Sequence, residues 1–164
     1  MSVDTMEKLF EEELRDLYSA ENQITKTLPK LAKSAKSAEL RTAFEHHLKE
    51  TEGHVQRLEQ IFELLGKSPK GKTCQGMKGV LEEGAAMLSE SAEGDIRDVA
   101  MISAAQRVEH YEMAAYGTVR TYAERLGKPQ VVQLLEKTLE EEKAADKKLS
   151  EISHQKYQHV QRAA

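Results

Sequence analysis

The chain has 164 residues, which suffices for one domain that buries an apolar core without disulfide or metal staples. Tryptophan is absent, aromatic residues make up 5 %, and Ala, Glu, Lys, Leu and Gln are abundant. These residues lose least on entering a helix, so the composition favours an all-helical protein. The net charge of −4 provides no basic field for nucleic acid. No apolar run approaches the roughly 20 residues of a membrane span.

Cysteine usage and the N-terminus bear on the compartment. Cys74 is the single cysteine, so no disulfide can form within the chain, and a reducing compartment is the simpler expectation. The residues from Met1 to Asp4 lack the basic stretch and apolar core of a signal peptide. We therefore expect a cytoplasmic protein with neither a nucleic-acid nor a membrane partner.

The first two periodic segments predict long helices. Residues 5–33 carry apolar side chains in alternating steps of three and four, as a helix buried along one stripe requires. The second helix is expected over about residues 38–65. Ser37 is a suitable N-cap for it, and Gly66 is a favoured residue just past a helix end.

Three further helices are expected in the second half. A shorter amphipathic helix covers about residues 74–91, and a long helix covers about residues 95–126. The last helix covers about residues 130–153 and follows Pro129, a residue favoured in the first helical turn.

The lengths of the connections predict the topology. Residues 34–37 and 127–129 form short links, which imply antiparallel neighbouring helices. Residues 66–94 form a much longer connection that contains the short helix. Two antiparallel hairpins joined by one long crossover is the connectivity of ferritin-like bundles. The alternative is a plain bundle on which the middle segment docks as a fifth helix.

Each long helix carries ionisable residues on its buried stripe, near the middle of its length. A lone buried carboxylate costs several kcal/mol unless it is paired or ligated. Because four helices place such groups at similar depth, we expect them to meet in the core. A pair of divalent metal ions there would offset the cost of burying them. In chain order these residues are Glu21, His47, His54, Glu109, Glu112 and Glu142, with Glu50 on the flank of the second stripe.

Other interpretations remain open for several of these residues. A single glutamate within an apolar stripe is often a surface residue at the edge of the buried face. His47 and His54 are also compatible with hydrogen-bonded core residues, and His54 is the better ligand candidate of the two. Asp146 lies one turn beyond Glu142, where it would add a ligand or cap a hydrogen-bond network. Whether Glu141 or Glu142 faces the core is not decided by the pattern.

Three runs resemble the YciE/YciF family of bacterial stress-induced proteins. They are LRDLYSAE at residues 14–21, QRVEHYE at 106–112 and LEEEKAAD at 139–146. The similarity extends over roughly residues 5–152. The resemblance implies a ferritin-like four-helix bundle with an added short helix, a dimeric assembly and no established biochemical activity.

A more distant resemblance concerns the run from Glu109 to Glu112. Glu-His-Tyr-Glu is similar to the third-helix motif of rubrerythrin, a di-iron peroxidase, and Glu21 lies where the first-helix ligand of rubrerythrin would lie. This resemblance implies that Glu21, Glu109 and Glu112 are metal ligands, although Glu112 is also compatible with pairing to an arginine or lysine.

The chain departs from the di-iron pattern on two helices. Such bundles carry Glu-x-x-His on the second and fourth helices. Here Glu50 is followed by Gly53 at the histidine position and by His54 one residue later. Glu142 is followed by Asp146 at a spacing of four, which still shares a helix face. One imidazole of the usual set is therefore missing.

The sequence predicts an all-α, ferritin-like stress protein that binds one or two iron or manganese ions. Peroxide- or iron-oxidising activity would follow, with Tyr18 or Tyr111 as a hydrogen-bond donor at the site. The alternative is a non-catalytic dimeric interaction module with a degenerate metal site; mineral storage in a large cage is a third. The predicted metal residues are Glu21, Glu50, His54, Glu109, Glu112, Glu142 and Asp146.

The helix over residues 74–91 is the segment we expect at a homodimer interface. Its methionines and leucines exceed what a solvated crossover requires, and methionine adapts well to a partner surface. The alternative is that this helix packs only on its own bundle.

Overall fold

The computed structural model describes residues 3–160, and five helices make up most of that range. The helices match the expected segments to within one residue, except that the last one continues to Val160 rather than ending near Ser153. Within residues 3–160, no helix combines the length and apolarity that crossing a membrane requires. The bounds are α1 Met6–Ser34, α2 Ala38–Leu65, α3 Gln75–Glu90, α4 Asp95–Arg125 and α5 Pro129–Val160.

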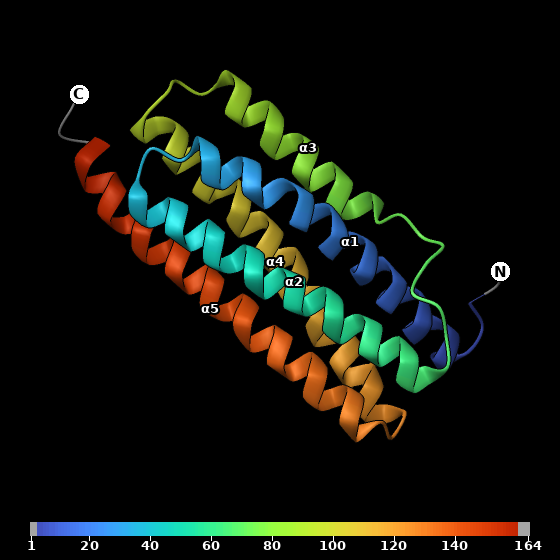
Figure 1. The fold of residues 1–164 in the computed structure, drawn as a ribbon. Helices are drawn as coiled ribbons and strands as arrows, with labels where there is room; N and C mark the ends of the chain where they lie inside the picture. The colour runs from blue at the N-terminus through green and yellow to red at the C-terminus, as the bar shows by residue number, and fades with distance from the viewer. Residues whose placement is uncertain (1–2, 161–164) are drawn as a thin grey trace.

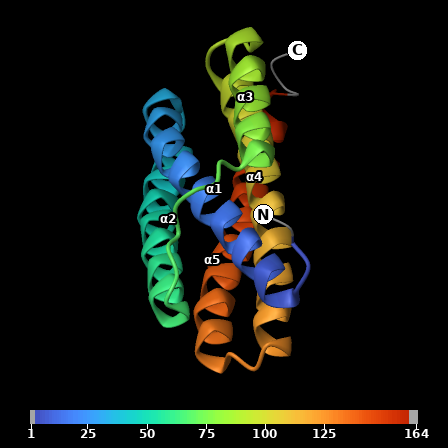
Figure 2. The ribbon, with the colours of Figure 1, turned by 90° about the vertical axis from the view of Figure 1, so that its right-hand side faces the viewer.

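Two antiparallel hairpins form the bundle, as the short links predict. α1 packs on α2, and α4 packs on α5. Figure 1 shows the four long helices side by side, with the shorter α3 on the outside. α3 contacts α4 and α1. In Figure 2 the connection from α2 passes across α1 to reach α3, so residues 66–94 form the predicted long crossover.

The helix boundaries follow local chemistry. The Ser37 hydroxyl caps α2 by accepting a hydrogen bond from the backbone N–H of Leu40 at 3.4 Å. Gly66 ends α2 in the left-handed conformation, with φ 64°, which glycine adopts without strain. Pro129 begins α5, where a missing N–H removes no helical hydrogen bond.

The apolar core is divided into two clusters along the bundle. On α1, Leu17 belongs to one cluster and Ile24 to the other, and the buried Glu21 lies between them. The first cluster includes Ile24, Leu28, Leu40, Phe44, Met101 and Leu149. The second includes Phe10, Leu14, Leu17, Leu58, Ile61 and Val119. The division leaves a polar band across the middle of the bundle.

A buried carboxylate fixes the link between the first two helices. Asp98 of α4 is fully buried and accepts hydrogen bonds from the backbone N–H groups of Lys36, at 2.8 Å, and Ser37, at 2.9 Å. The Lys156 ammonium of α5 lies 3.3 Å from the same carboxylate. With a second contact to Asp95 at 2.9 Å, Lys156 joins the last turns of α5 to α4.

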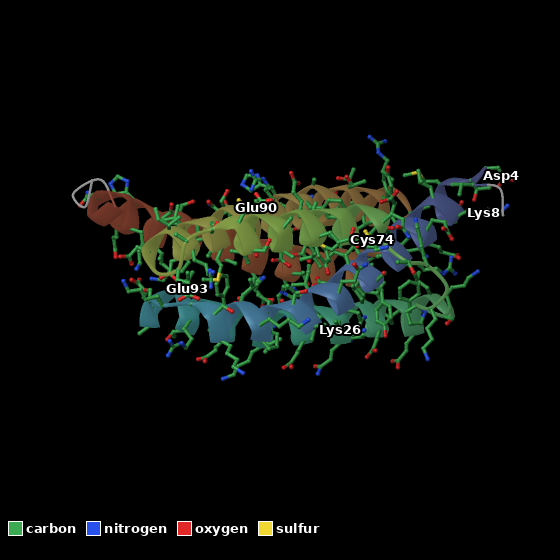
Figure 3. All side chains as sticks on the ribbon, turned by 90° about the horizontal axis from the view of Figure 1, so that it is seen from above. Asp4, Lys8, Lys26, Cys74, Glu90 and Glu93 are labelled. Atoms are coloured by element: carbon green, nitrogen blue, oxygen red, sulfur yellow. The ribbon has the colours of Figure 1, made fainter. Side chains whose placement is uncertain are left out.

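The beginning of α3 is fastened to α1 and α4. Cys74, which Figure 3 labels, caps the helix. Its buried thiol donates a hydrogen bond to Asp16 Oδ2 at 2.9 Å and lies 3.1 Å from the Tyr111 hydroxyl. Burial and the carboxylate raise the pKa of the Cys74 thiol. A Cβ at Gly76 would lie 2.7 Å from the Tyr111 hydroxyl, so only glycine fits there. Met77 is completely buried in the bundle. α3 therefore packs on its own chain, and its role in a dimer stays a prediction.

Candidate metal centre

Six ionisable side chains from the four long helices meet in the polar band. Each belongs to a residue that is at most 6 % exposed. Five of the seven predicted metal residues are among them, and His47 is the sixth member. The set consists of Glu21 from α1, His47 and His54 from α2, Glu109 and Glu112 from α4, and Glu142 from α5.

Helix periodicity explains why these residues converge. Glu109 and Glu112 are three residues apart, and His47 and His54 are seven apart, so each pair lies on one face of its helix. On α5, Glu142 is completely buried, whereas the Glu141 side chain is 23 % exposed. The structure thus decides the register of α5, with Glu142 in the core.

The six residues form two overlapping groups that could each hold a metal ion. In the first, one ligand atom from each of four residues lies within 4.8 Å of all the others; these are His47, Glu109, Glu112 and Glu142. The second group consists of Glu21, His54 and Glu142 under the same limit. Glu142 belongs to both groups, so its carboxylate would be shared if each group held an ion.

The distances show how closely the groups approach. His47 Nε2 lies 3.1 Å from Glu109 Oε1 and 3.7 Å from Glu142 Oε2. His54 Nδ1 lies 2.9 Å from Glu142 Oε1 and 3.2 Å from Glu21 Oε1. The two oxygens of Glu142 therefore face different histidines.

Residues around the six fix the orientation of His54. Its Nε2 lies 3.0 Å from Glu141 Oε2. The Arg57 guanidinium lies 2.7 Å from the same oxygen and donates a 2.7 Å hydrogen bond to the Thr138 hydroxyl. With Nε2 held by Glu141, Nδ1 is directed at the buried carboxylates. This is the outer support that metal-binding imidazoles usually have.

Burial governs the protonation of two of the carboxyl groups. Desolvation, reinforced by the neighbouring carboxylates Glu142 and Glu21, raises the pKa of Glu112 well above its ordinary value. Desolvation also raises the pKa of Glu142 to about 8, although His54 opposes the shift. Glu109 behaves differently: burial alone would raise its pKa, but the facing His47 outweighs burial and lowers it.

The two histidines carry positive charge that faces these carboxylates. Burial by itself lowers the pKa of His54, but its contacts with Glu142 and Glu21 outweigh burial and raise the pKa to about 10. Burial likewise opposes the charge on His47, and Glu109 raises its pKa well above the ordinary value. Without metal, protons on both imidazoles and on some of the carboxyl groups therefore balance the charge of the centre.

Several buried polar atoms of the centre have no hydrogen-bond partner. Such groups are costly in a protein interior. Imidazole nitrogen and carboxylate oxygen together suit iron and manganese, so the donor set fits a metal pair. The atoms are Glu21 Oε2, His47 Nε2, His54 Nδ1, Glu109 Oε2 and both carboxylate oxygens of Glu112 and Glu142.

The other two predicted metal residues lie outside both groups. Glu50 is 22 % exposed at its side chain, and its Oε2 lies 3.4 Å from His47 Nδ1. Glu50 thereby contacts the ring nitrogen of His47 that does not face Glu109. Asp146 accepts a hydrogen bond from Gln106 at 3.1 Å and lies 3.3 Å from His110. The structure does not bring Asp146 to the centre, and a ligand role for either residue stays a prediction.

The tyrosine at the centre is not one of the two that we expected. Tyr18 donates its hydrogen bond to Glu59, and Tyr111 donates to Asp16. Tyr116, completely buried, donates instead to Glu21 Oε1. Burial, then the charge of Glu21, raises its pKa, so the hydroxyl keeps its proton. The expectation failed because both other tyrosines face away from the polar band.

The role of His47 was underestimated from the sequence. Glu50 and His54 come nearest to the Glu-x-x-His pattern, and His47 lies outside it. The informative signal was the seven-residue spacing of His47 and His54, which is two helical turns. α2 thus supplies two imidazoles instead of one glutamate and one imidazole.

Residues 5–162 match the family described as a domain of unknown function, DUF892. The chain belongs to the DUF892 family. One relative is the protein YciF of Escherichia coli strain K12. The two sequences are 43 % identical over 154 residues, and the alignment covers 93 % of each chain. The resemblance to the YciE/YciF family is confirmed.

Solved structures agree with this membership. The crystal structure of the E. coli stress protein YciF matches with a TM-score of 0.90 over 95 % of this chain and 99 % of that one. YcfI from Rhodopseudomonas palustris is 43 % identical, with a TM-score of 0.88 over 92 % and 97 % of the two chains. Ferritin-like, diiron-carboxylate proteins from Bacillus anthracis match with a TM-score of 0.71 at 17 % identity over 93 % and 99 %. The DUF892 chain therefore has the ferritin-like fold.

Proposed function

We propose that the chain binds two divalent metal ions, iron or manganese, with Glu142 as the bridging carboxylate. One ion would take His47, Glu109 and Glu112, and the other would take Glu21 and His54. The observation that carries this proposal is the set of buried, unpartnered oxygen and nitrogen atoms that point into the band. A network built only for stability would leave few such atoms.

Bound as a pair, two such ions would together supply the two electrons that reduce a peroxide, and ferrous ions would be the iron oxidised in that step. The residues around them would keep a proton in place and fix the orientation of the ligands. Tyr116 keeps a proton on its hydroxyl beside Glu21. Arg57 and Glu141 hold the His54 ring in place from the outer side. The apolar clusters enclose the carboxylates above and below along the bundle. We propose this activity as part of a bacterial stress response, because YciF carries the description of a stress protein.

The proposal is tested on protein purified without chelator or an affinity metal. Elemental analysis should find one to two equivalents of iron or manganese per chain, about one for each group of ligands. Melting curves with and without EDTA should differ, because a metal that binds only the folded state raises the melting temperature by mass action. A metal-free protein whose melt ignores both EDTA and added metal would contradict the proposal.

A second candidate is a non-catalytic dimeric interaction module. It is favoured by the close contacts of His47 with Glu109 and of His54 with Glu142, which place opposite charges together without a metal. We place its homodimer contact on α3, where Val80 is half-buried against the chain's own core. The EDTA experiment separates the two candidates, because an ion-pair network would not respond to chelation.

A further inference from the structure

A pocket of about 580 Å³ opens between α2 and α5. Its volume falls in the range of sites that enclose small organic molecules. The walls are mostly apolar and include Ala43, Phe44, Ala145 and Leu149. Its lining also includes His47 and Glu109, which are the most deeply buried polar residues along it. The pocket therefore leads from the surface to one side of the candidate metal centre.

The charges at the rim of the pocket are paired with one another. Lys148 Nζ lies 2.8 Å from Glu39 Oε1, and His46 Nδ1 lies 3.3 Å from Glu50 Oε2. An ion that entered would lose hydration against apolar walls and would compete with these existing pairs. A neutral molecule pays no such desolvation and gains from covering the apolar walls. The lining consequently disfavours a free metal cation or an anion as the occupant.

The inner end of the pocket can hydrogen-bond a polar group. His47 Nε2 and Glu109 Oε2 are buried and lack hydrogen-bond partners. Glu109 Oε2 offers a free acceptor, whereas His47 Nε2 already faces Glu109 Oε1 at 3.1 Å. A single hydroxyl or hydroperoxyl group can donate a hydrogen bond to that acceptor. The inner end thus fits the polar end of a molecule whose body fills the apolar part.

We propose that this pocket binds a neutral alkyl or aryl molecule that carries one hydroxyl or hydroperoxyl group and presents that group to the unpartnered oxygen of Glu109. The proposal names a substrate class for the candidate metal centre and in that sense rests on the proposed function. Binding itself uses only the side chains of the pocket. It is therefore expected in the metal-free protein as well.

The test uses the metal-free chain of residues 1–164 and the fluorescent probe phenylnaphthylamine, which is neutral and apolar. The probe should bind, and octanol should displace it at a concentration at least about tenfold below that of octanoate, whose charge must be desolvated. Ala145→Leu and Ala43→Leu fill the pocket without adding a charge, and each should weaken probe binding by at least about tenfold. Ala114→Leu adds the same atoms on an exposed position of α4 and should leave binding unchanged.

Three results would overturn the proposal. One is equal probe binding by Ala145→Leu, Ala43→Leu and Ala114→Leu, each shown by circular dichroism to be folded. Another is equal displacement by octanol and octanoate. A third is a dimer in sedimentation that Ala145→Leu dissociates, with no probe binding to the wild type, which would show that a second copy covers the pocket. If the chain binds the probe but no metal, the pocket proposal stands and the proposed function fails. If it binds metal but no probe, the proposed function stands and the pocket proposal fails.

Discussion

Replacing Glu142 with alanine is expected to abolish loading of a second metal ion and to weaken the remaining site by about 100-fold or more. The reason is that Glu142 is the one residue shared by both groups of ligands, so its loss removes an oxygen from each. Manganese titration followed by calorimetry, with elemental analysis after dialysis, measures both the number of bound ions and their affinity.

The matched control is Glu140→Ala. Glu140 belongs to the same acidic run, but its side chain is 60 % exposed and pairs with Lys143 at the surface. This variant should load metal like the wild type. Melting of the metal-free variants checks that both fold. Equal metal content and affinity in Glu142→Ala and Glu140→Ala would show that the buried carboxylate takes no part in binding.

The stability of the metal-free protein is expected to fall by about 3 kcal/mol or more as pH rises from about 5 to 9. Burial raises the pKa values of Glu112 and Glu142, the latter to about 8, and carboxylate contacts raise that of His54 to about 10. Over this pH window the folded chain therefore binds more protons than the unfolded chain does. Stability consequently decreases as pH rises. Denaturant unfolding at several pH values measures the trend.

Metal binding should show the opposite dependence on pH. The ligands must release their protons to bind a cation, so the apparent affinity should increase steeply over the same window. The increase in melting temperature on adding manganese should therefore be larger at pH 8.5 than at pH 5.5, taken as about the two ends of the window. Glu109 and Glu50, whose pKa values are lowered, act only at more acid pH. A metal-free protein that gains stability between these pH values would refute the assigned protonation.

Local signals were sufficient to predict the fold. The stripes of α1 and α2, the capping Ser37 and the terminal Gly66 set the helix bounds, because they act through neighbouring residues. The two short links and the long crossover determined the topology. The end of α5 was missed; there Lys156 contacts Asp98, a residue far away in the sequence that no local pattern reveals.

The site could be predicted only in part, because local signals reveal the residues of one helix and not how the helices meet. Glu21, Glu109 and Glu112 interrupt apolar stripes, and that signal is visible within one helix. Which residues of α2 and α5 meet them depends on how the helices are rotated against one another, and periodicity defines this only within a residue or two. The part of His47, and the placement of Asp146 beside Gln106 rather than in either group, therefore required the three-dimensional arrangement.

The central claim is that two metal ions share Glu142, and anomalous X-ray scattering from a crystal grown with manganese tests it most directly. The account predicts two anomalous peaks, one beside His47, Glu109 and Glu112 and the other beside Glu21 and His54, with Glu142 between them. A crystal with manganese in the solution and no anomalous peak in the band between the two apolar clusters would contradict it.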